Sequence, residues 1–406
     1  MRRFFAALLV LGCLLTALVP AASAQTRSFR DLDAIENRSQ VMLLVDLGMI
    51  SGYQDGTFRP QATITRAETA KLISLLYTAP PKAAAVADTS FSDVAGHWAE
   101  SAILFCAQQG VITGDGNGLF RPGDPVTARE LAKMLLVVIG GDGARYTGPA
   151  WADQVDSDAK AQGIYTRFTD DPALPVSRDD ACLLIYNAMQ GWAIDGYHED
   201  GSVRYVMDSL RNPVSFLEVR FNVVRYTGVV TGNQCADLTT GGVLDEGLTK
   251  LEGHTAFHVT TDLSLVGQCV DLYVRDGSVI GVPCASASAV SYTFESYREL
   301  SDLFQRTDYQ LDPKAAIYYN YAAAEADVLE TLPSNSTITV LDQNGDQKFE
   351  WVLAVTFQTA SVEKLSPLTI RTGTGAVEAQ PMETGDLFAV GQTVQAIQVA
   401  DKWYLR

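Results

Sequence analysis

Residues 52–68 read Gly52-Tyr-Gln-Asp-Gly-Thr-Phe-Arg-Pro-Gln-Ala-Thr-Ile-Thr-Arg-Ala-Glu68, and the same pattern returns at 114–130. The second copy stands 62 positions later without a gap and keeps Phe-Arg-Pro at 120–122. A repeat of this length indicates a supersecondary unit that needs a neighbouring copy to bury its apolar face. The loop therefore belongs to a repeated element, and that element decides the fold of this part of the chain.

The sequence on both sides of the loop predicts helices. In the second copy, an apolar helical pattern after residue 98 ends at Gly110, and glycine commonly follows a helix C-terminus. After Thr127, apolar residues recur at the i, i+3, i+4, i+7 spacing of a helix face. Segments 29–77 and 91–140 are each predicted to form a helix, a loop and a second helix.

A third and more divergent copy is predicted over 146–190. Trp151 stands 12 residues before Gly163, as Trp98 stands 12 residues before Gly110. The copy has Val-Ser-Arg-Asp-Asp at 176–180 in place of Ile-Thr-Arg-Ala-Glu, and it lacks the Phe-Arg-Pro motif.

Phe-Ser-Asp-Val-Ala-Gly-His-Trp-Ala at 91–99, together with the motifs at 52–60 and 64–68, resembles the S-layer homology (SLH) repeat. This resemblance covers 29–190. It implies all-α helix-loop-helix repeats packed as a compact pseudo-threefold unit, with ligand grooves between neighbouring repeats. It also implies a partner, an acidic and often pyruvylated secondary cell-wall polysaccharide attached to peptidoglycan.

Arginines at the start of the second helices are the first candidates for contact with such a polymer. Arg66 and Arg178 stand where a positive charge disfavours the helix, unless an anion joins it. Free N–H groups and a guanidinium together would suit a carboxylate or phosphate; the alternative is a solvent-facing arginine. Arg129 is displaced by one position, or about 100° around the helix, so its access to the same groove stays open.

Four further residues are candidates for polysaccharide binding. Trp98 and Trp151 could stack on a sugar ring, although core packing between repeats explains them equally well. Asp55 and Gly56 have the composition of a turn, and the glycine would let a ligand approach the backbone.

Three residue pairs are predicted to cap the second helices. In a capping box, a Ser or Thr hydroxyl accepts a hydrogen bond from a backbone N–H, and an acidic residue three positions later bonds back. The pairs are Thr65 with Glu68, Thr127 with Glu130, and Ser177 with Asp180. Asp31 and Asp93 are expected to cap the first helices.

The N-terminus and the composition indicate export. Residues 1–24 have the positive start, apolar run and Ala-Ser-Ala end of a signal peptide. Without them the chain has 28 basic and 48 acidic residues, a net charge of −20, which argues against nucleic acid as a partner. No later apolar stretch is long enough to predict a membrane span.

Cysteines are too sparse for a disulfide scaffold. Five remain after residue 24. Cys106 and Cys182 lie in apolar helical patterns and are predicted to be buried thiols. One disulfide among Cys235, Cys269 and Cys284 is compatible with the sequence, which does not select the pair.

Residues 200–406 are predicted to be mainly β, in one or two small domains. The chain is expected to form strands at 217–226, 272–274, 279–282 and 394–405, one or two short helices within 295–330, and a hairpin turning at 344–345. Asp342, Asn344 and Asp346 are spaced like calcium ligands but fit a hairpin turn better. A metal site at Glu252, His254 and His258 is also disfavoured. No metal or cofactor is expected.

The signal peptide and the resemblance to SLH repeats together imply a secreted bacterial protein held non-covalently on the wall by residues 29–190. Residues 200–406 would form a displayed structural or interaction module, with self-association in a surface layer as an open possibility. The chain contains no GxSxG, Walker, GxGxxG or HExxH motif, so the prediction is a non-enzyme. The alternatives are an anchored polysaccharide or peptide hydrolase with its active site in 200–406, and a binding module for a surface partner.

Overall fold

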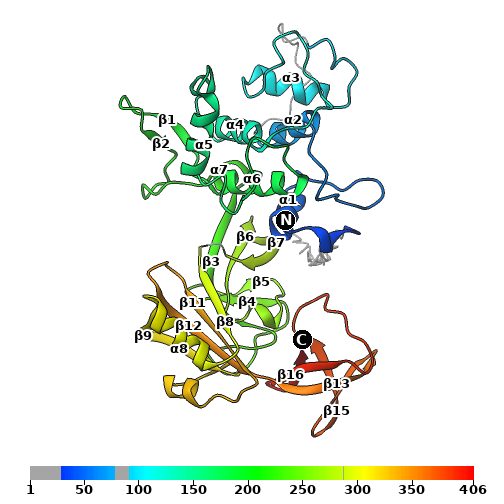
Figure 1. Cartoon of the computed structure of the whole chain (residues 1–406), viewed down its shortest axis with the longest axis vertical. Coiled ribbons are helices and arrows are strands. Elements are labelled where there is room, and N and C mark those ends of the chain that lie inside the picture. The colour runs from blue at the N-terminus through cyan, green and yellow to red at the C-terminus, as the bar shows by residue number, and fades with distance from the viewer. Residues whose placement is uncertain (1–28, 78–90, 287) are drawn as a thin grey trace, which may run out of the picture.

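A computed structural model describes residues 29–77, 91–286 and 288–406. Helices α1 to α7, within residues 38–221, gather at one end of the molecule, and β-sheets with the helix α8 (Tyr297–Arg306) occupy the rest (Figure 1). The predicted multidomain arrangement, a helical N-terminal region followed by a mainly β region, is confirmed. The predicted signal peptide at 1–24 lies outside the described residues. No helix within the described ranges combines the length and apolar character needed to cross a membrane.

The helical region contains six α-helices and two short 3₁₀ helices within the described residues. In chain order they are η1 (Leu32–Ala34), α1 (Arg38–Asp46), α2 (Arg66–Leu75), α3 (Glu100–Gln108), α4 (Ala128–Val138), η2 (Gly143–Tyr146), α5 (Trp151–Ala161) and α6 (Arg178–Gln190). Each of the segments 29–77, 91–140 and 146–190 thus holds two α-helices separated by a loop.

The loop ends and helix starts of the three segments bond to one another in a closed cycle. We call residues 60–67, 122–129 and 172–179 the capping ring. The N–H groups of Arg66 and Ala67 donate to carbonyls in 122–124, and the starts of α4 and α6 donate likewise to 172–174 and 60–62, at 2.8–3.2 Å. Ile64, Val126 and Val176 also bond to one another in sequence around the ring. The ring joins chain segments more than 100 residues apart.

Two aspartates hold the loops rather than the helices. Asp93 accepts hydrogen bonds from the N–H groups of Phe120 and Arg121 at 2.9 and 2.7 Å, and Asp31 does the same in the first loop. Neither caps the helix that follows it: Asp31 makes no side-chain cap bond, and Ala99 precedes α3. The expectation that they cap helices is therefore wrong. Their carboxylates hold the Phe-Arg-Pro turn, where Arg121 has a φ of 59°.

The repeated glycine that begins each loop has a steric cause. A Cβ at Gly114 would lie 2.6 Å from the Phe91 ring and 2.7 Å from the carbonyl oxygen of Leu119. Gly52 meets Phe29 in the same way, at 2.8 Å. The aromatic ring at the start of each repeat packs directly against this glycine, so a larger residue would displace the loop.

The chain passes into the β region through a helix that the sequence pattern did not reveal. Residues 217–226 were expected to form a strand, but α7 (Phe216–Phe221) occupies its first half, and β3 (Val223–Asn233) begins only after Asn222. Ser215 accepts a hydrogen bond from the N–H of Glu218 at 3.1 Å, and Asn222 ends the helix with a φ of 53°. A capped helix start outweighed the β-branched and aromatic composition.

Three larger sheets form the β region, and one hairpin lies beside the helices (Figure 1). The hairpin is β1 (Ile194–Tyr197) with β2 (Val203–Tyr205), and the first sheet has the order β5-β4-β3-β6-β7. Its other strands are β4 (Leu248–Leu251), β5 (Phe257–His258), β6 (Cys269–Arg275) and β7 (Ser278–Ala285). The predicted strands at 272–274 and 279–282 lie in β6 and β7.

The second sheet, β10-β9-β12-β11-β8, contains the predicted hairpin at 344–345 between β11 (Ser336–Asp342) and β12 (Lys348–Thr356). The remaining elements here are β8 (Val290–Phe294), α8 (Tyr297–Arg306), β9 (Gln310–Tyr319), β10 (Ala322–Ala323) and the 3₁₀ helix η4 (Ala326–Thr331). The expected helices within 295–330 are therefore α8 and η4, with the strand β9 between them.

The third sheet is a closed barrel, β13-β14-β15-β17-β16. Its strands are β13 (Gln358–Leu365), β14 (Leu368–Thr372), β15 (Gly375–Pro381), β16 (Thr393–Val399) and β17 (Lys402–Leu405). The alternating C-terminal pattern at 394–405 corresponds to β16 and β17.

The helical region and the first sheet share one hydrophobic core. The core of the helices continues to Val223 and Tyr273 of β3 and β6. The hydroxyls of Tyr186 on α6 and Tyr273 are hydrogen-bonded, and Asp46 of α1 accepts a bond from the N–H of Gly281 at 2.8 Å. This shared core makes the junction a packed interface.

All five cysteines of the described residues are free thiols, so Cys235, Cys269 and Cys284 form no disulfide. Cys106 and Cys182 are buried as predicted, and burial raises the pKa of both thiols to about 12.

We predict that Asp31→Asn with Asp93→Asn destabilises the helical region by about 1–2 kcal/mol per site, because each loop loses a charged acceptor of two N–H bonds. Burial alone would raise the pKa of both carboxyls, but the N–H donors outweigh it and the pKa is lowered. Their contribution is therefore complete above about pH 4 and is lost as the pH falls toward the lowered folded-state pKa.

Urea unfolding at several pH values measures this difference. Asp33→Asn is the matched control, because the Asp33 side chain is exposed. Equal stability losses for the double variant at pH 7 and pH 3 would contradict the assignment.

Candidate functional site

A groove of about 390 Å³ lies between α4 and α5. Its lining combines two cations, one carboxylate and two aromatic rings: Arg66, Lys133, Glu130, Tyr146 and Trp151. We call it the α4–α5 groove. Arg66 comes from α2, so two repeats and the first helix of the next one contribute to it.

Arg66 is held at the edge of this groove by backbone carbonyls. Its Nε donates to the oxygen of Phe120 at 2.8 Å, and an Nη donates to the oxygen of Thr113 at 2.9 Å. The guanidinium carbon lies 4.6 Å from the centre of the Phe120 ring. None of the ion pairs among the described residues involves Arg66, so its charge has no carboxylate partner.

Lys133 supplies the second cation. Its Nζ lies 5.6 Å from the centre of the Trp151 ring. Burial lowers the pKa of Lys133, although the nearby Glu130 opposes this effect. The Glu130 carboxylate is already used, because it accepts hydrogen bonds from the N–H and hydroxyl of Thr127 at 2.9 and 3.1 Å. The groove therefore offers an anion two charged donors beside an indole face.

Sequence reasoning missed Lys133 and Tyr146 as groove residues. The signal for Lys133 was present, because Lys71 occupies the same position in the first repeat, 62 residues earlier. Tyr146 lies in a 3₁₀ turn with no counterpart in the repeat motif.

Arg178, the counterpart of Arg66 on α6, is only 8% exposed. Its Nε donates to the oxygen of Phe58 at 3.0 Å, as Arg66 does to Phe120. Unlike Arg66, it also forms an ion pair with Glu68 at 3.2 Å. The Glu68 carboxylate thus already uses part of the hydrogen-bonding capacity of this guanidinium.

The displaced Arg129 has a different partner. Its guanidinium forms a two-pronged ion pair with Asp156 of α5, with N–O distances of 2.7–3.0 Å. The hydroxyl of Tyr165 donates to the same carboxylate at 3.0 Å. The shift of one position therefore directs this arginine to a carboxylate of the following repeat.

The expected free N–H groups at the helix starts do not exist. The capping ring occupies the first two N–H groups of α2, α4 and α6. The third is bonded to the hydroxyl of Thr65, Thr127 or Ser177. Thr65–Glu68 and Thr127–Glu130 form reciprocal capping boxes, whereas the Ser177 hydroxyl donates to Asp180 at 2.7 Å. Any anion in these grooves must be held by side chains.

The remaining candidates lie at two different places. Trp98 precedes α3, is 64% exposed and packs on the ring of His97. Asp55 accepts hydrogen bonds from Thr57 and forms an ion pair with Arg59, and these contacts hold its pKa well below the ordinary value. Gly56 has a φ of 81°, which fits a turn glycine. Neither Trp98 nor the Asp55–Gly56 turn lines the α4–α5 groove.

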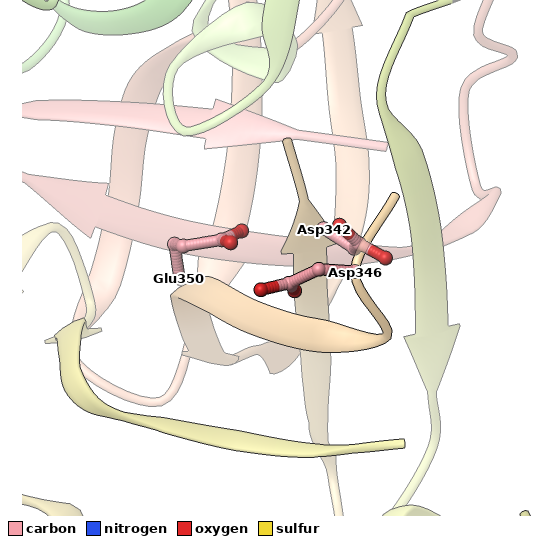
Figure 2. Close-up of side chains that lie close together, drawn as sticks. All are labelled: Asp342, Asp346 and Glu350. Carbon is pink, nitrogen blue, oxygen red and sulfur yellow. The ribbon is translucent and has the colours of Figure 1, made fainter. Parts of the chain in front are cut away.

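Asp342, Asp346 and Glu350 bring their carboxylates together at the 344–345 turn (Figure 2). The buried Asp342 carboxylate accepts bonds from the N–H groups of Asn344, Gly345 and Gln347 at 2.7–3.2 Å. Glu350 accepts from Gln343 and Asn344. The cluster thus closes the hairpin.

The second group considered as a metal site is Glu252, His254 and His258. Glu252 accepts a bond from Gln343, His254 packs on Tyr226 and His258 is exposed.

Comparison with known proteins identifies the first two repeats. A family model for the S-layer homology domain matches residues 28–70 and 90–132. The chain is 29% identical over 205 residues to a surface-layer 125 kDa protein of Lysinibacillus sphaericus, covering 47% of this chain and 17% of that protein. It is 25% identical over 163 residues to a cellulosome-anchoring protein of Acetivibrio thermocellus, covering 36% of each.

A third relative is an uncharacterized cell wall amidase of Bacillus anthracis, 32% identical over 113 residues, which are 28% of this chain and 20% of that protein. The chain thus spans well under two thirds of these relatives. The predicted resemblance to S-layer homology proteins is confirmed, as is the predicted place among proteins of the cell wall or surface layer.

We predict that Arg178→Ala destabilises the fold by roughly 3 kcal/mol, because it leaves Glu68 without its buried partner. Arg204→Ala is the control, since Arg204 and Asp195 form an exposed pair whose loss should cost less than about 1 kcal/mol. Urea denaturation of both variants measures the difference. Equal, small losses of unfolding free energy in the two variants would show that the Arg178–Glu68 pair does not stabilise the fold.

Proposed function

Because the chain carries S-layer homology domains, we propose that residues 29–190 anchor it non-covalently to an acidic secondary polysaccharide of the bacterial cell wall. Residues 200–406 then form a structural or interaction module displayed at the surface. The relatives named as surface-layer and anchoring proteins support this proposal.

The observation that carries the proposal is the composition of the α4–α5 groove. A carboxylate, such as a pyruvate ketal on a sugar, would take charged hydrogen bonds from Arg66 and Lys133. The apolar face of the sugar ring would pack on Trp151. Binding would also return a counter-charge to Lys133, whose pKa is lowered by burial. Because the chain as a whole is strongly acidic, this local pair of cations, and not the net charge, attracts the anionic ligand.

We propose further that the three repeats form one pseudo-threefold unit whose grooves are unequal. The cyclic bonding of the capping ring supports the common unit. At the starts of α6 and α4 the arginine already forms an ion pair, Arg178 with Glu68 and Arg129 with Asp156. A ligand carboxylate would have to displace a protein carboxylate there, so the α4–α5 groove is the principal site.

The displayed region is proposed to act without catalysis, as a lattice or interaction module. The match to a protein named as an amidase keeps wall hydrolysis as a second candidate. Incubating the purified chain with wall sacculi and measuring released soluble fragments decides between them. Release above the level of heat-inactivated protein would favour the enzyme.

We predict that Arg66→Ala combined with Lys133→Ala weakens wall binding at least tenfold, because both charged donors to the ligand are lost. The measurement is co-sedimentation of the purified chain with sacculi, before and after acid extraction of the secondary polymer. Lys314→Ala, in the β region, is the control for a lost positive charge.

The proposal requires three results: wild-type binding that disappears on extraction, binding by the Lys314 variant, and loss of binding by the double variant with an unchanged circular dichroism spectrum. Undiminished binding by a folded double variant would show that the α4–α5 groove is not the binding site. Binding that survives extraction would show that the secondary polysaccharide is not the ligand.

A further inference from the structure

A second pocket, of about 570 Å³, lies at the junction of the helical region and the first sheet. We call it the junction pocket. The ends of α5 and α6 form one wall, and Arg225 of β3 and Asp271 of β6 line the opposite side. Trp192 and Tyr205 also line the pocket. Its volume is within the usual range for small-molecule sites.

The sheet side of this pocket is polar and fixed in register. Thr227 pairs with Asp271, and Arg225 pairs with Tyr273, across β3 and β6. Residues at alternate positions of paired strands share one face, so these four side chains lie on the same face of the sheet. Tyr273 is tied to Tyr186 of α6, which fixes this face against the helix.

Asp271 is a buried carboxylate without a cationic partner. It is 3% exposed, and its Oδ1 accepts bonds from the hydroxyls of Thr227 and Ser286 at 2.6 and 3.0 Å. Its Oδ2 receives no hydrogen bond from the described residues. A buried carboxylate whose donors are hydroxyl groups suits a further hydroxyl donor and disfavours an anion.

Two donors in the pocket also lack acceptors. The Nε2 atom of Gln190 is buried and has no hydrogen-bond partner among the described residues. The guanidinium of Arg225 is exposed and forms no ion pair or side-chain hydrogen bond within the same residues, so it is free to donate to a ligand. Because buried polar groups are normally satisfied, the unpaired Gln190 amide and the free Asp271 oxygen in the lining of one pocket form an unusual arrangement that a ligand would complete.

Trp192 supplies an apolar face beside these polar groups. Its side chain remains 46% exposed although it lines the pocket. An indole next to hydroxyl-binding groups matches a pyranose ring, which has an apolar C–H face and a rim of hydroxyls.

We propose that the junction pocket binds a neutral sugar, a hexopyranose or N-acetylhexosamine unit of a glycan. Trp192 stacks on the ring, Asp271 accepts from its hydroxyls, and Gln190 and Arg225 donate to its oxygens. This site differs in charge preference from the α4–α5 groove, and the inference does not depend on the function proposed for that groove.

Isothermal titration of the purified secreted protein tests the proposal with three probes: cellobiose, maltose and the β-1,4-linked disaccharide of N-acetylglucosamine. We expect saturable binding of at least one, with a Kd of roughly 1 mM. Trp192→Ala and Asp271→Asn should each weaken it at least tenfold. Leu387→Ala is the control, because it removes an exposed apolar side chain outside the pocket.

The Arg66→Ala, Lys133→Ala protein must retain the same sugar affinity, which separates this site from the anionic groove. Absence of binding to all three sugars would overturn the proposal, as would equal affinity in a folded Trp192 variant. Saturable binding of dialanine instead of the sugars, abolished by Trp192→Ala, would overturn it in favour of a zwitterionic peptide. Loss of sugar binding in the double variant would also overturn it.

Discussion

Nine backbone hydrogen bonds of the capping ring are the constraint on which the helical region depends. Each of the segments 60–67, 122–129 and 172–179 exchanges hydrogen bonds with both neighbours: two helix-start N–H groups donate to one neighbour, and the N–H of Ile64, Val126 or Val176 donates to the other. Prolines at 60, 122 and 172 contribute only carbonyls there, which suits a position that has to accept without donating. No segment can satisfy its helix start alone, so the helices should form as a unit.

The ring also determines which donors remain free near the helix starts. Since it uses the helix N–H groups, the proposed recognition of an anion would depend on side chains that project from the ring. Arg66, Arg129 and Arg178 start from similar sequence positions and reach different partners: carbonyls, Asp156 and Glu68. The groove with the unpaired arginine is also the groove with Lys133 and Trp151. The three helix starts are therefore unequal in the charge that they leave unpaired.

The sequence predicted the first two repeats, the paired helices of all three segments and the hairpin at 344–345, because these depend on local spacing and turn chemistry. It did not predict the ring, because the acceptors for α2 and α6 lie about 60 and 120 residues away in the chain. The sequence analysis predicted a strand where α7 forms, because it gave more weight to the β-branched and aromatic composition than to the Ser215 cap. The junction pocket could not be predicted, since it depends on the β3–β6 register and the position of α6. Lys133 could have been found by comparing it with Lys71.

Native-state hydrogen exchange of the nine ring amides tests the central claim most directly. These are the N–H groups of Ile64, Arg66, Ala67, Val126, Ala128, Arg129, Val176, Arg178 and Asp179. The account predicts that all nine open with one shared free energy, close to that for unfolding of the helical region, because breaking one link opens the cycle. Three different values, each low and typical of a fraying helix start, would contradict it.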